Sequence, residues 1–154
     1  MTASGSSAPR LVEVSGAEAL WLLDGSTVGR LVFTLHGLPA IRPARHVLEH
    51  GALVVRAAIP AAALSGSADR PAILAYHADE IDPAAAHGWS VTALGPATPV
   101  TDPHIEAHHR RNLPGWALGP HDTLLRLHPQ SVTGHRLVRP AHSVPDKQRR
   151  GSTR

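Results

Sequence analysis

The densest group of side chains that could do chemistry is a run of histidines near residue 105. His104 and His108 are four residues apart, a spacing that places two imidazoles on one face of a helix, and His109 adjoins them. Two imidazoles supply half of a zinc site, so further ligands would have to come from elsewhere in the chain. The segment also lacks the His-Glu-x-x-His arrangement of zinc proteases. We interpret these histidines as a solvated helix face and predict no metal site.

Other self-contained catalytic motifs are missing from the sequence. The chain has no cysteine, which excludes disulfides, thiolate zinc sites and cysteine nucleophiles. It contains neither a Gly-x-Ser-x-Gly elbow nor a Walker-type phosphate loop. A Ser-His-Asp triad stays open, because all three residue types are common in the chain. Spacing alone therefore points to no particular reaction.

The basic character of the chain is concentrated at its C-terminal end. The 154 residues carry a net charge of +3 and a pI of about 10.5. Five of the 15 basic residues, but one of the 12 acidic residues, lie in residues 139–154, so residues 1–138 are nearly neutral. This segment has too few apolar residues to fold, and we predict a basic disordered tail. With so few charges to neutralise phosphates, we do not expect a nucleic-acid partner.

The length of the chain is typical of one domain. We place a flexible leader at residues 1–10, one folded domain at 11–138 and the tail at 139–154. No segment has the apolar character of a signal peptide or the roughly 20 apolar residues that cross a bilayer. We therefore predict a cytoplasmic protein without a membrane partner.

The elements that must position any functional residues are mostly short strands. Ser15 and Glu18 have the spacing of a capping box and predict a helix through Leu23. Asp102 is the expected N-cap of a second helix over 103–112, and 59–67 is read as one or two helical turns. Alternating apolar residues and turn signals predict strands at 29–35, 40–48, 52–57, 71–78, 88–100 and 122–128, with a further candidate at 132–138.

Two positions inside these strands are expected to disturb the pairing. Pro43 removes a ladder donor and predicts an edge or a bulge, and Gly95-Pro96 predicts a kink or a bulge. Successive hairpins and the lack of an alternating βαβ pattern favour an antiparallel arrangement. We predict a mainly β (α+β) domain, a small antiparallel barrel of about six strands with short capping helices.

The order of short segments along the chain resembles the pyridoxamine 5′-phosphate oxidase-like flavoproteins, which are split β-barrels that bind FMN. The resemblance covers roughly residues 11–138. It is carried by these segments: Gly29 to Phe33, Gly37-Leu38-Pro39, Arg42 to Val47, Val54-Val55-Arg56, Pro71 to Tyr76, Gly88 to Val91, Pro114 to Ala117, Arg126 to Pro129 and Val132 to Leu137. It implies a six-stranded antiparallel split β-barrel.

The resemblance also implies a set of cofactor-binding residues. The strand segment that lines the flavin ring in the family corresponds to Pro43, Ala44, Arg45 and His46. Arg56 and Ala57 match the family's arginine and threonine, although Ala57 lacks the hydroxyl and 58–64 lacks the usual glycine and lysine. The remaining matches to the flavin pocket are Trp89, Ser90 and Trp116.

The resulting hypothesis is a flavin-dependent oxidoreductase that acts on a small-molecule substrate. The resemblance implies FMN, or a related deazaflavin, bound at the interface of a homodimer. Arg56, with Arg45 or Arg42, would hold the phosphate, and no protein side chain need act as acid or base. Because a lysine and a hydroxyl are missing, a second hypothesis stays open: a non-catalytic binding or regulatory module with a degraded flavin site.

Overall fold

The structure of the protein, a computed structural model, describes residues 8–66, 69–113, 116 and 119–140. Its described part contains one antiparallel sheet of eight strands in the order β1-β8-β6-β5-β2-β3-β4-β7. The strands are β1 (Arg10–Val14), β2 (Val28–Leu35), β3 (Leu38–Glu49), β4 (Ala52–Ala58), β5 (Ala72–Asp82), β6 (His87–Pro99), β7 (Asp122–Leu127) and β8 (Ser131–Val138).

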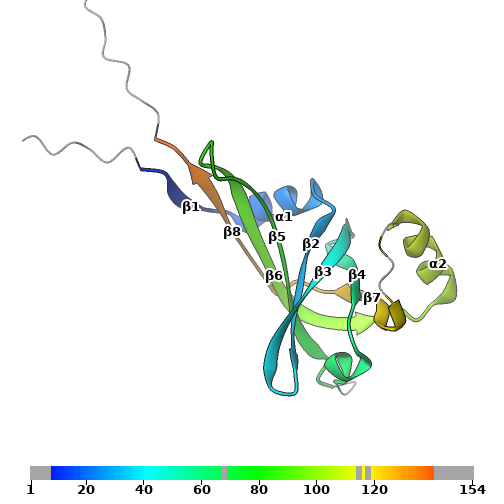
Figure 1. The fold of residues 1–154 in the computed structure, drawn as a ribbon. Helices are drawn as coiled ribbons and strands as arrows, with labels where there is room; N and C mark the ends of the chain where they lie inside the picture. The colour runs from blue at the N-terminus through cyan, green and yellow to red at the C-terminus, as the bar shows by residue number, and fades with distance from the viewer. Residues whose placement is uncertain (1–7, 67–68, 114–115, 117–118, 141–154) are drawn as a thin grey trace, which may run out of the picture.

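Six of these strands, β2 to β7, close into a barrel. Closure occurs because β6 pairs with β7 at one end in addition to its pairing with β5. The strands β8 and β1 extend the sheet beyond the barrel from the other end of β6, as Figure 1 shows. Apolar side chains of β2, β4, β5 and β7 fill the interior. The predicted mainly β, split-barrel fold is confirmed.

The Gly95-Pro96 pair marks the point where β6 exchanges one partner for another. Residues 88–94 pair with β8, and residues 97–99 pair with β7. A Cβ atom on Gly95 would lie 1.9 Å from the carbonyl oxygen of His128, so the exchange requires glycine at this position. The predicted irregularity is therefore the site where the barrel splits, while the pairing of β6 with β5 continues through it.

Pro43 lies where β3 has a partner on one side. It pairs with Arg30 of β2, whereas the pairing of β3 with β4 begins at Ala44. A missing backbone N–H is tolerated at such an edge. The prediction of an edge at Pro43 is confirmed for this half of the strand.

Two α-helices are attached to the outside of the sheet. The first, α1 (Gly16–Asp24), is capped by Ser15, whose Oγ accepts from the backbone N–H of Glu18 at 3.1 Å. It packs against β8 and β6, and the Glu18 carboxylate accepts from Arg136 Nε at 2.6 Å. The second, α2 (Pro103–Asn112), is capped by Asp102 as predicted. Two short 3-10 turns, η1 (Ala61–Leu64) and η2 (Gly119–His121), complete the elements of the described part of the chain.

The structure adds one strand and lengthens another relative to the sequence prediction. Strand β1 was not predicted, and β5 continues through the acidic segment to Asp82 instead of ending before it. Residues 1–7 of the expected leader and 141–154 of the expected tail lie outside the described residues, as do Pro114, Gly115 and Ala117 of the resemblance. No helix in the described part has the length and apolar character needed to cross a bilayer.

Candidate functional site

Strand alternation divides the predicted β3 residues between the two faces of the sheet. Ala44 and His46 point into the barrel, where both are buried. Pro43 and Arg45 point outward, and Arg45 lies directly opposite Arg56 of β4. The fold therefore brings Arg45 and Arg56 together on the outer face and places Ala44 and His46 in the core. Ala57, the next predicted residue of β4, is also fully buried.

Arg45 meets Trp116 on the outer face. Its guanidinium carbon lies 6.0 Å from the centroid of the Trp116 ring, a cation–π geometry. Arg42 belongs to the opposite face of β3, where its guanidinium carbon lies 5.7 Å from the Phe33 ring centroid. The structure therefore groups Arg45 with Trp116 and Arg56 but places Arg42 elsewhere.

The guanidinium of Arg56 is held by an acidic partner from β7. Its Nε and Nη2 donate to the two carboxylate oxygens of Asp122 at 3.0 and 2.8 Å, and Nη1 donates to the Leu113 carbonyl at 2.9 Å. Asp122 also forms an ion pair with Arg110 of α2 at 3.1 Å. These contacts use the guanidinium N–H donors of Arg56 that would otherwise bind a phosphate. The phosphate role of Arg56 stays a prediction.

Replacing Asp122 with alanine is expected to lower the free energy of unfolding by about 2 kcal/mol, because the half-buried Arg56 loses its charged acceptor. Hydrogen bonds from Arg56 lower the pKa of Asp122 below its ordinary value of 3.8. The stabilisation is therefore complete above pH 3.8 and is lost as the pH falls through the lowered pKa. Urea unfolding at pH 7 and pH 3 measures both effects. Glu13→Ala, on an exposed strand residue, is the control, and equal stability of the two variants would contradict the prediction.

His46 is part of a buried hydrogen-bond network that connects three elements. Its Nε2 lies 2.9 Å from the Leu23 carbonyl oxygen, and its Nδ1 contacts the hydroxyl of Tyr76. Because a carbonyl can only accept, Nε2 carries the proton and the Tyr76 hydroxyl donates to Nδ1. Burial lowers the pKa of His46 and raises that of Tyr76, so both are neutral. This arrangement makes His46 a core residue and keeps its side chain off the outer face.

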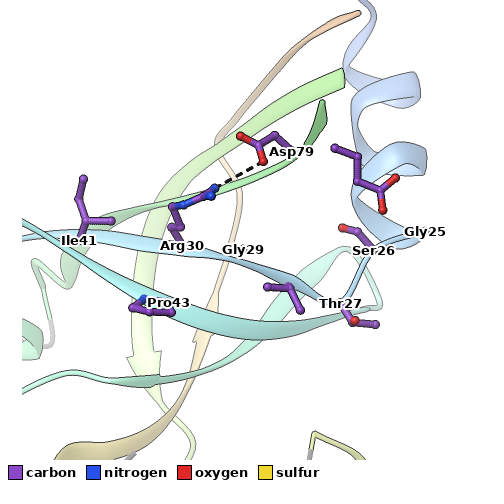
Figure 2. A pocket seen from close by; sticks show the side chains of 10 residues that line it. Gly25, Ser26, Thr27, Gly29, Arg30, Ile41, Pro43 and Asp79 are labelled. Carbon is purple, nitrogen blue, oxygen red and sulfur yellow. Dashed lines mark ion pairs between the residues drawn. The ribbon is translucent and has the colours of Figure 1, made fainter. Parts of the chain in front are cut away.

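A pocket of about 580 Å³ opens on the outer face beside Pro43. The segment from Gly25 to Arg30 forms one wall, and Ile41, Pro43, Asp79 and Glu80 complete the lining. Figure 2 shows Arg30 and Asp79 reaching toward each other across the pocket, with nitrogen and oxygen 3.6 Å apart. Hydroxyls from Ser26 and Thr27 add neutral hydrogen-bonding groups. The pocket therefore offers one cation, two carboxylates and two hydroxyls beside apolar surface.

Sequence reasoning singled out Pro43 of this pocket but missed its polar residues. Arg30 could have been found, because it lies between two inward-facing residues of a correctly predicted strand and must therefore point outward. Asp79 was missed because the predicted strand ended at residue 78, just before the acidic segment 79–82, whereas β5 includes this segment. Ser26 lies just beyond the helix that the sequence predicts through Leu23, and no motif marked it. The pocket combines three segments that are distant in the sequence, which no local pattern reveals.

Trp89 and Ser90 lie on opposite faces of β6. Trp89 is 8% exposed and donates its indole N–H to Glu80 Oε2 at 3.3 Å. Ser90 Oγ lies 2.9 Å from His77 Nε2. Asp79 approaches that same nitrogen at 4.0 Å, so it does not orient the other ring nitrogen as a catalytic triad requires. The structure thus separates Trp89 from Arg45 and gives Ser90 and His77 no triad geometry.

The histidines of α2 have separate environments. His109 is buried, with Nε2 3.5 Å from Glu49 Oε2, and His108 contacts the side-chain amide of Asn112. Burial lowers the pKa of His109. Among the residues that the structure describes, no group of three or more histidine, aspartate or glutamate side chains is arranged to hold a metal ion.

Comparison with known proteins identifies the family. The model of the pyridoxamine 5′-phosphate oxidase family matches residues 15–136. The uncharacterized protein Rv0080 of Mycobacterium tuberculosis is 41% identical over 139 residues, which cover 88% of this chain and 91% of Rv0080. The resemblance inferred from the order of sequence segments is thereby confirmed.

Solved structures share the fold. An FAD-binding protein from Mycobacterium smegmatis is 27% identical, with a TM-score of 0.58, and the match covers 81% of this chain and 96% of that one. An FAD-binding protein from Mesorhizobium loti is 18% identical, with a TM-score of 0.67, and the match covers 85% and 99% of the two chains. On the family match and the identity to Rv0080, this chain belongs to the pyridoxamine 5′-phosphate oxidase family.

Proposed function

We propose that the protein binds a flavin along the outer face of β2, β3 and β4 and acts with it as an oxidoreductase on a small-molecule substrate. The cofactor we favour is FMN, with a deazaflavin as the related possibility. The observation that carries the proposal is the position of Arg45 in the strand pair beside the pocket. Val28 lines the pocket and lies directly opposite Arg45 in the β2–β3 register.

The size and lining of the pocket support the proposal that it holds the ring portion of a flavin. Its volume of about 580 Å³ lies within the range of roughly 300–1,000 Å³ that is common for small-molecule sites. Pro43, Val28 and Ile41 supply apolar surface, while the hydroxyls of Ser26 and Thr27 can bond to the polar edge of a ring. A bound flavin would supply hydride-transfer chemistry, and the protein would orient it and its substrate.

The phosphate is assigned to Arg45 rather than Arg56. A dianionic phosphate is costly to desolvate unless charge-assisted donors meet it. Asp122 and the Leu113 carbonyl already engage Arg56. Arg45 sits at the rim of the pocket, and its planar guanidinium is suited to phosphate. Trp116 beside Arg45 would limit the directions from which a ligand approaches.

A homodimer would cover the exposed apolar residues of the same face. Val28, Ile41 and Ile73 are 49%, 57% and 55% exposed, although each belongs to the barrel sheet. Such residues on a sheet face favour a protein partner, and a two-fold assembly would place two flavin sites at its interface. We therefore expect the protein to sediment as a dimer at micromolar concentration in analytical ultracentrifugation.

The second candidate function is a binding or regulatory module without turnover. The hydrogen bonds between Arg56 and Asp122 favour this function. Arg56 matches the arginine that holds the phosphate in the family, and while it is bound to Asp122 it does not hold a cofactor. The lack of a lysine in residues 58–64 removes a second cation. Flavin titration combined with an assay for oxidation of an electron donor separates the two functions.

The test is titration of the purified protein with FMN and with a deazaflavin, followed by flavin absorbance and fluorescence. We expect saturable binding, and we expect Arg45→Ala to weaken the affinity by about 10- to 100-fold, the loss of one charge-assisted contact. Arg42→Ala is the matched control, because Arg42 lies on the opposite face of β3, and its affinity should change less than about twofold.

Absence of binding at tens of micromolar of either cofactor would overturn the flavin proposal and leave the non-catalytic module. Binding that is equally sensitive to Arg42→Ala and Arg45→Ala would overturn the assignment of the phosphate to the outer face. Binding without any oxidation of reduced nicotinamide or other electron donors would favour the module over the oxidoreductase.

A further inference from the structure

A second pocket, distinct from the one beside Pro43, lies between α1 and the β5–β6 hairpin. Its volume is about 430 Å³. Its wall from α1 includes Trp21 and Asp24, and its wall from the sheet includes Glu80, His87, Trp89 and Arg136. Trp21, Asp24 and His87 do not line the pocket beside Pro43. A ligand here would therefore contact side chains that a ligand beside Pro43 does not.

Two indoles border this pocket. Trp89 is nearly buried, and its N–H donates to Glu80 Oε2, which fixes the indole against the carboxylate. Trp21 is 69% exposed, although neighbouring Leu22 and Leu23 of the same helix are buried. The indole of Trp21 exposes a large apolar surface beside the pocket, and a ligand could cover that surface.

The pocket is electronegative. Asp24 is the last residue of α1, and α1 has no basic residue in its last turn, so a carboxylate sits at the negative end of the helix dipole. Glu80 adds a second carboxylate from β5. The arginine in the lining, Arg136, donates to Glu18 at 2.6 Å, so its charge is balanced there. A neighbouring hollow along the hairpin extends the acidic surface to Asp82.

Aromatic faces and carboxylates together select an organic cation. An ammonium group is attracted to the face of an indole and gains further from nearby negative charge. A neutral ligand of the same shape would gain the apolar contact but lose both electrostatic contributions. An anion would be repelled by Asp24 and Glu80.

We propose that the pocket formed by Trp21, Trp89, Asp24 and Glu80 binds an organic ammonium group. The site does not depend on the flavin proposal, because Trp21, Asp24 and Trp89 do not line the pocket beside Pro43. The two pockets share Gly25 and Glu80, so they are neighbours. A ligand in one can therefore influence the other through Glu80.

The test compares choline with 3,3-dimethylbutan-1-ol, a neutral molecule of the same shape. Binding is followed by tryptophan fluorescence of the full chain without added flavin, at low ionic strength. We expect choline to bind at least about fivefold more tightly than the neutral alcohol. Added salt should narrow this difference, because it screens the carboxylates.

Variants locate the site. Trp21→Ala and Glu80→Gln should each weaken choline binding by about five- to tenfold. Trp21→Phe, which keeps an aromatic face, should lose less. The matched controls are Trp116→Ala, which removes a different exposed indole, and Glu13→Gln, which removes a different exposed carboxylate, and both should bind choline as the unmodified protein does.

Equal affinity for choline and the alcohol, no saturable binding of choline, or equal losses in the target and control variants would each overturn the proposal. Circular dichroism of every variant checks that the fold is retained. If Trp21→Ala does not fold, Trp21→Phe and Glu80→Gln still decide the result. Flavin titration of Trp21→Ala separates this site from the flavin site, because Trp21 does not line the pocket beside Pro43, and loss of choline binding with intact flavin binding supports two separate sites.

Discussion

Replacing His46 with alanine is expected to lower the free energy of unfolding by about 3 kcal/mol. The side chain is 1% exposed, so its removal leaves a cavity in the core. It also leaves the Tyr76 hydroxyl and the Leu23 carbonyl without the imidazole that now pairs with both. Urea unfolding at pH 8 measures the loss. Tyr76→Phe, which removes one hydroxyl and little volume, should cost about 1–2 kcal/mol.

The same residue is expected to make stability depend on pH. Burial lowers the pKa of His46 from 6.5, so the unfolded chain binds a proton at a pH where the folded protein does not. Its stabilisation is complete above pH 6.5 and decreases as the pH falls from there toward the lowered folded pKa. Buried His109 adds a change of the same sign. Between pH 8 and pH 5, His46→Ala should lose less stability than the unmodified protein, and an identical pH dependence would contradict the assignment.

The sequence predicted the parts of the fold that depend on local signals. The hairpin turns at His36-Gly37 and His50-Gly51 adopt positive φ at both residues, which matches the turn type that glycine at the second position favours. Asp102 caps α2 because its short carboxylate accepts from the backbone N–H groups of the first turn. These features needed only neighbouring residues to be recognised.

The missed features depend on contacts between distant segments. Strand β1 is short and almost entirely exposed, and it forms only because β8, more than 100 residues later, offers an edge. Arg56 was assigned to a phosphate, but its partner Asp122 is 66 residues away and no spacing rule links the two. The exchange of β6 from β8 to β7 at Gly95 likewise depends on a distant residue, because the His128 carbonyl oxygen lies close to Gly95. Family resemblance supplied the overall arrangement, whereas these side-chain partners required the structure.

A glycine lies between the core network and the pocket beside Pro43. Gly29 lines the pocket on one side. On its other side, a Cβ atom would lie 2.5 Å from the Tyr76 hydroxyl oxygen and 2.5 Å from the His77 carbonyl oxygen. Strand β2 cannot easily move away, because β3 and β5 hold it from both sides. Tyr76 cannot rotate freely either, because its hydroxyl donates to His46.

Gly29→Ala is therefore expected to lower the free energy of unfolding by about 3–4 kcal/mol, a cost typical of severe overpacking in a constrained core. Urea unfolding measures it. Gly16→Ala is the matched control, because a Cβ there meets its nearest atom at an ordinary 3.8 Å, and its stability should be unchanged or slightly higher. A loss below about 0.5 kcal/mol in Gly29→Ala would contradict the close approach.

The double variant Gly29→Ala, Tyr76→Phe distinguishes the two clashes. Removing the hydroxyl relieves the contact with the Tyr76 oxygen but leaves the contacts with the His77 carbonyl oxygen at 2.5 Å and with the ring carbon Cε1 of residue 76 at 2.7 Å. We expect the double variant to be more stable than the sum of the single losses predicts, by about 1 kcal/mol or more, since the two residues touch. Additive losses would show that the contacts that remain, with the His77 carbonyl oxygen and the ring carbon Cε1, are what requires glycine. Flavin titration of the folded double variant then tests the proposed flavin site, because Gly29 lines the pocket.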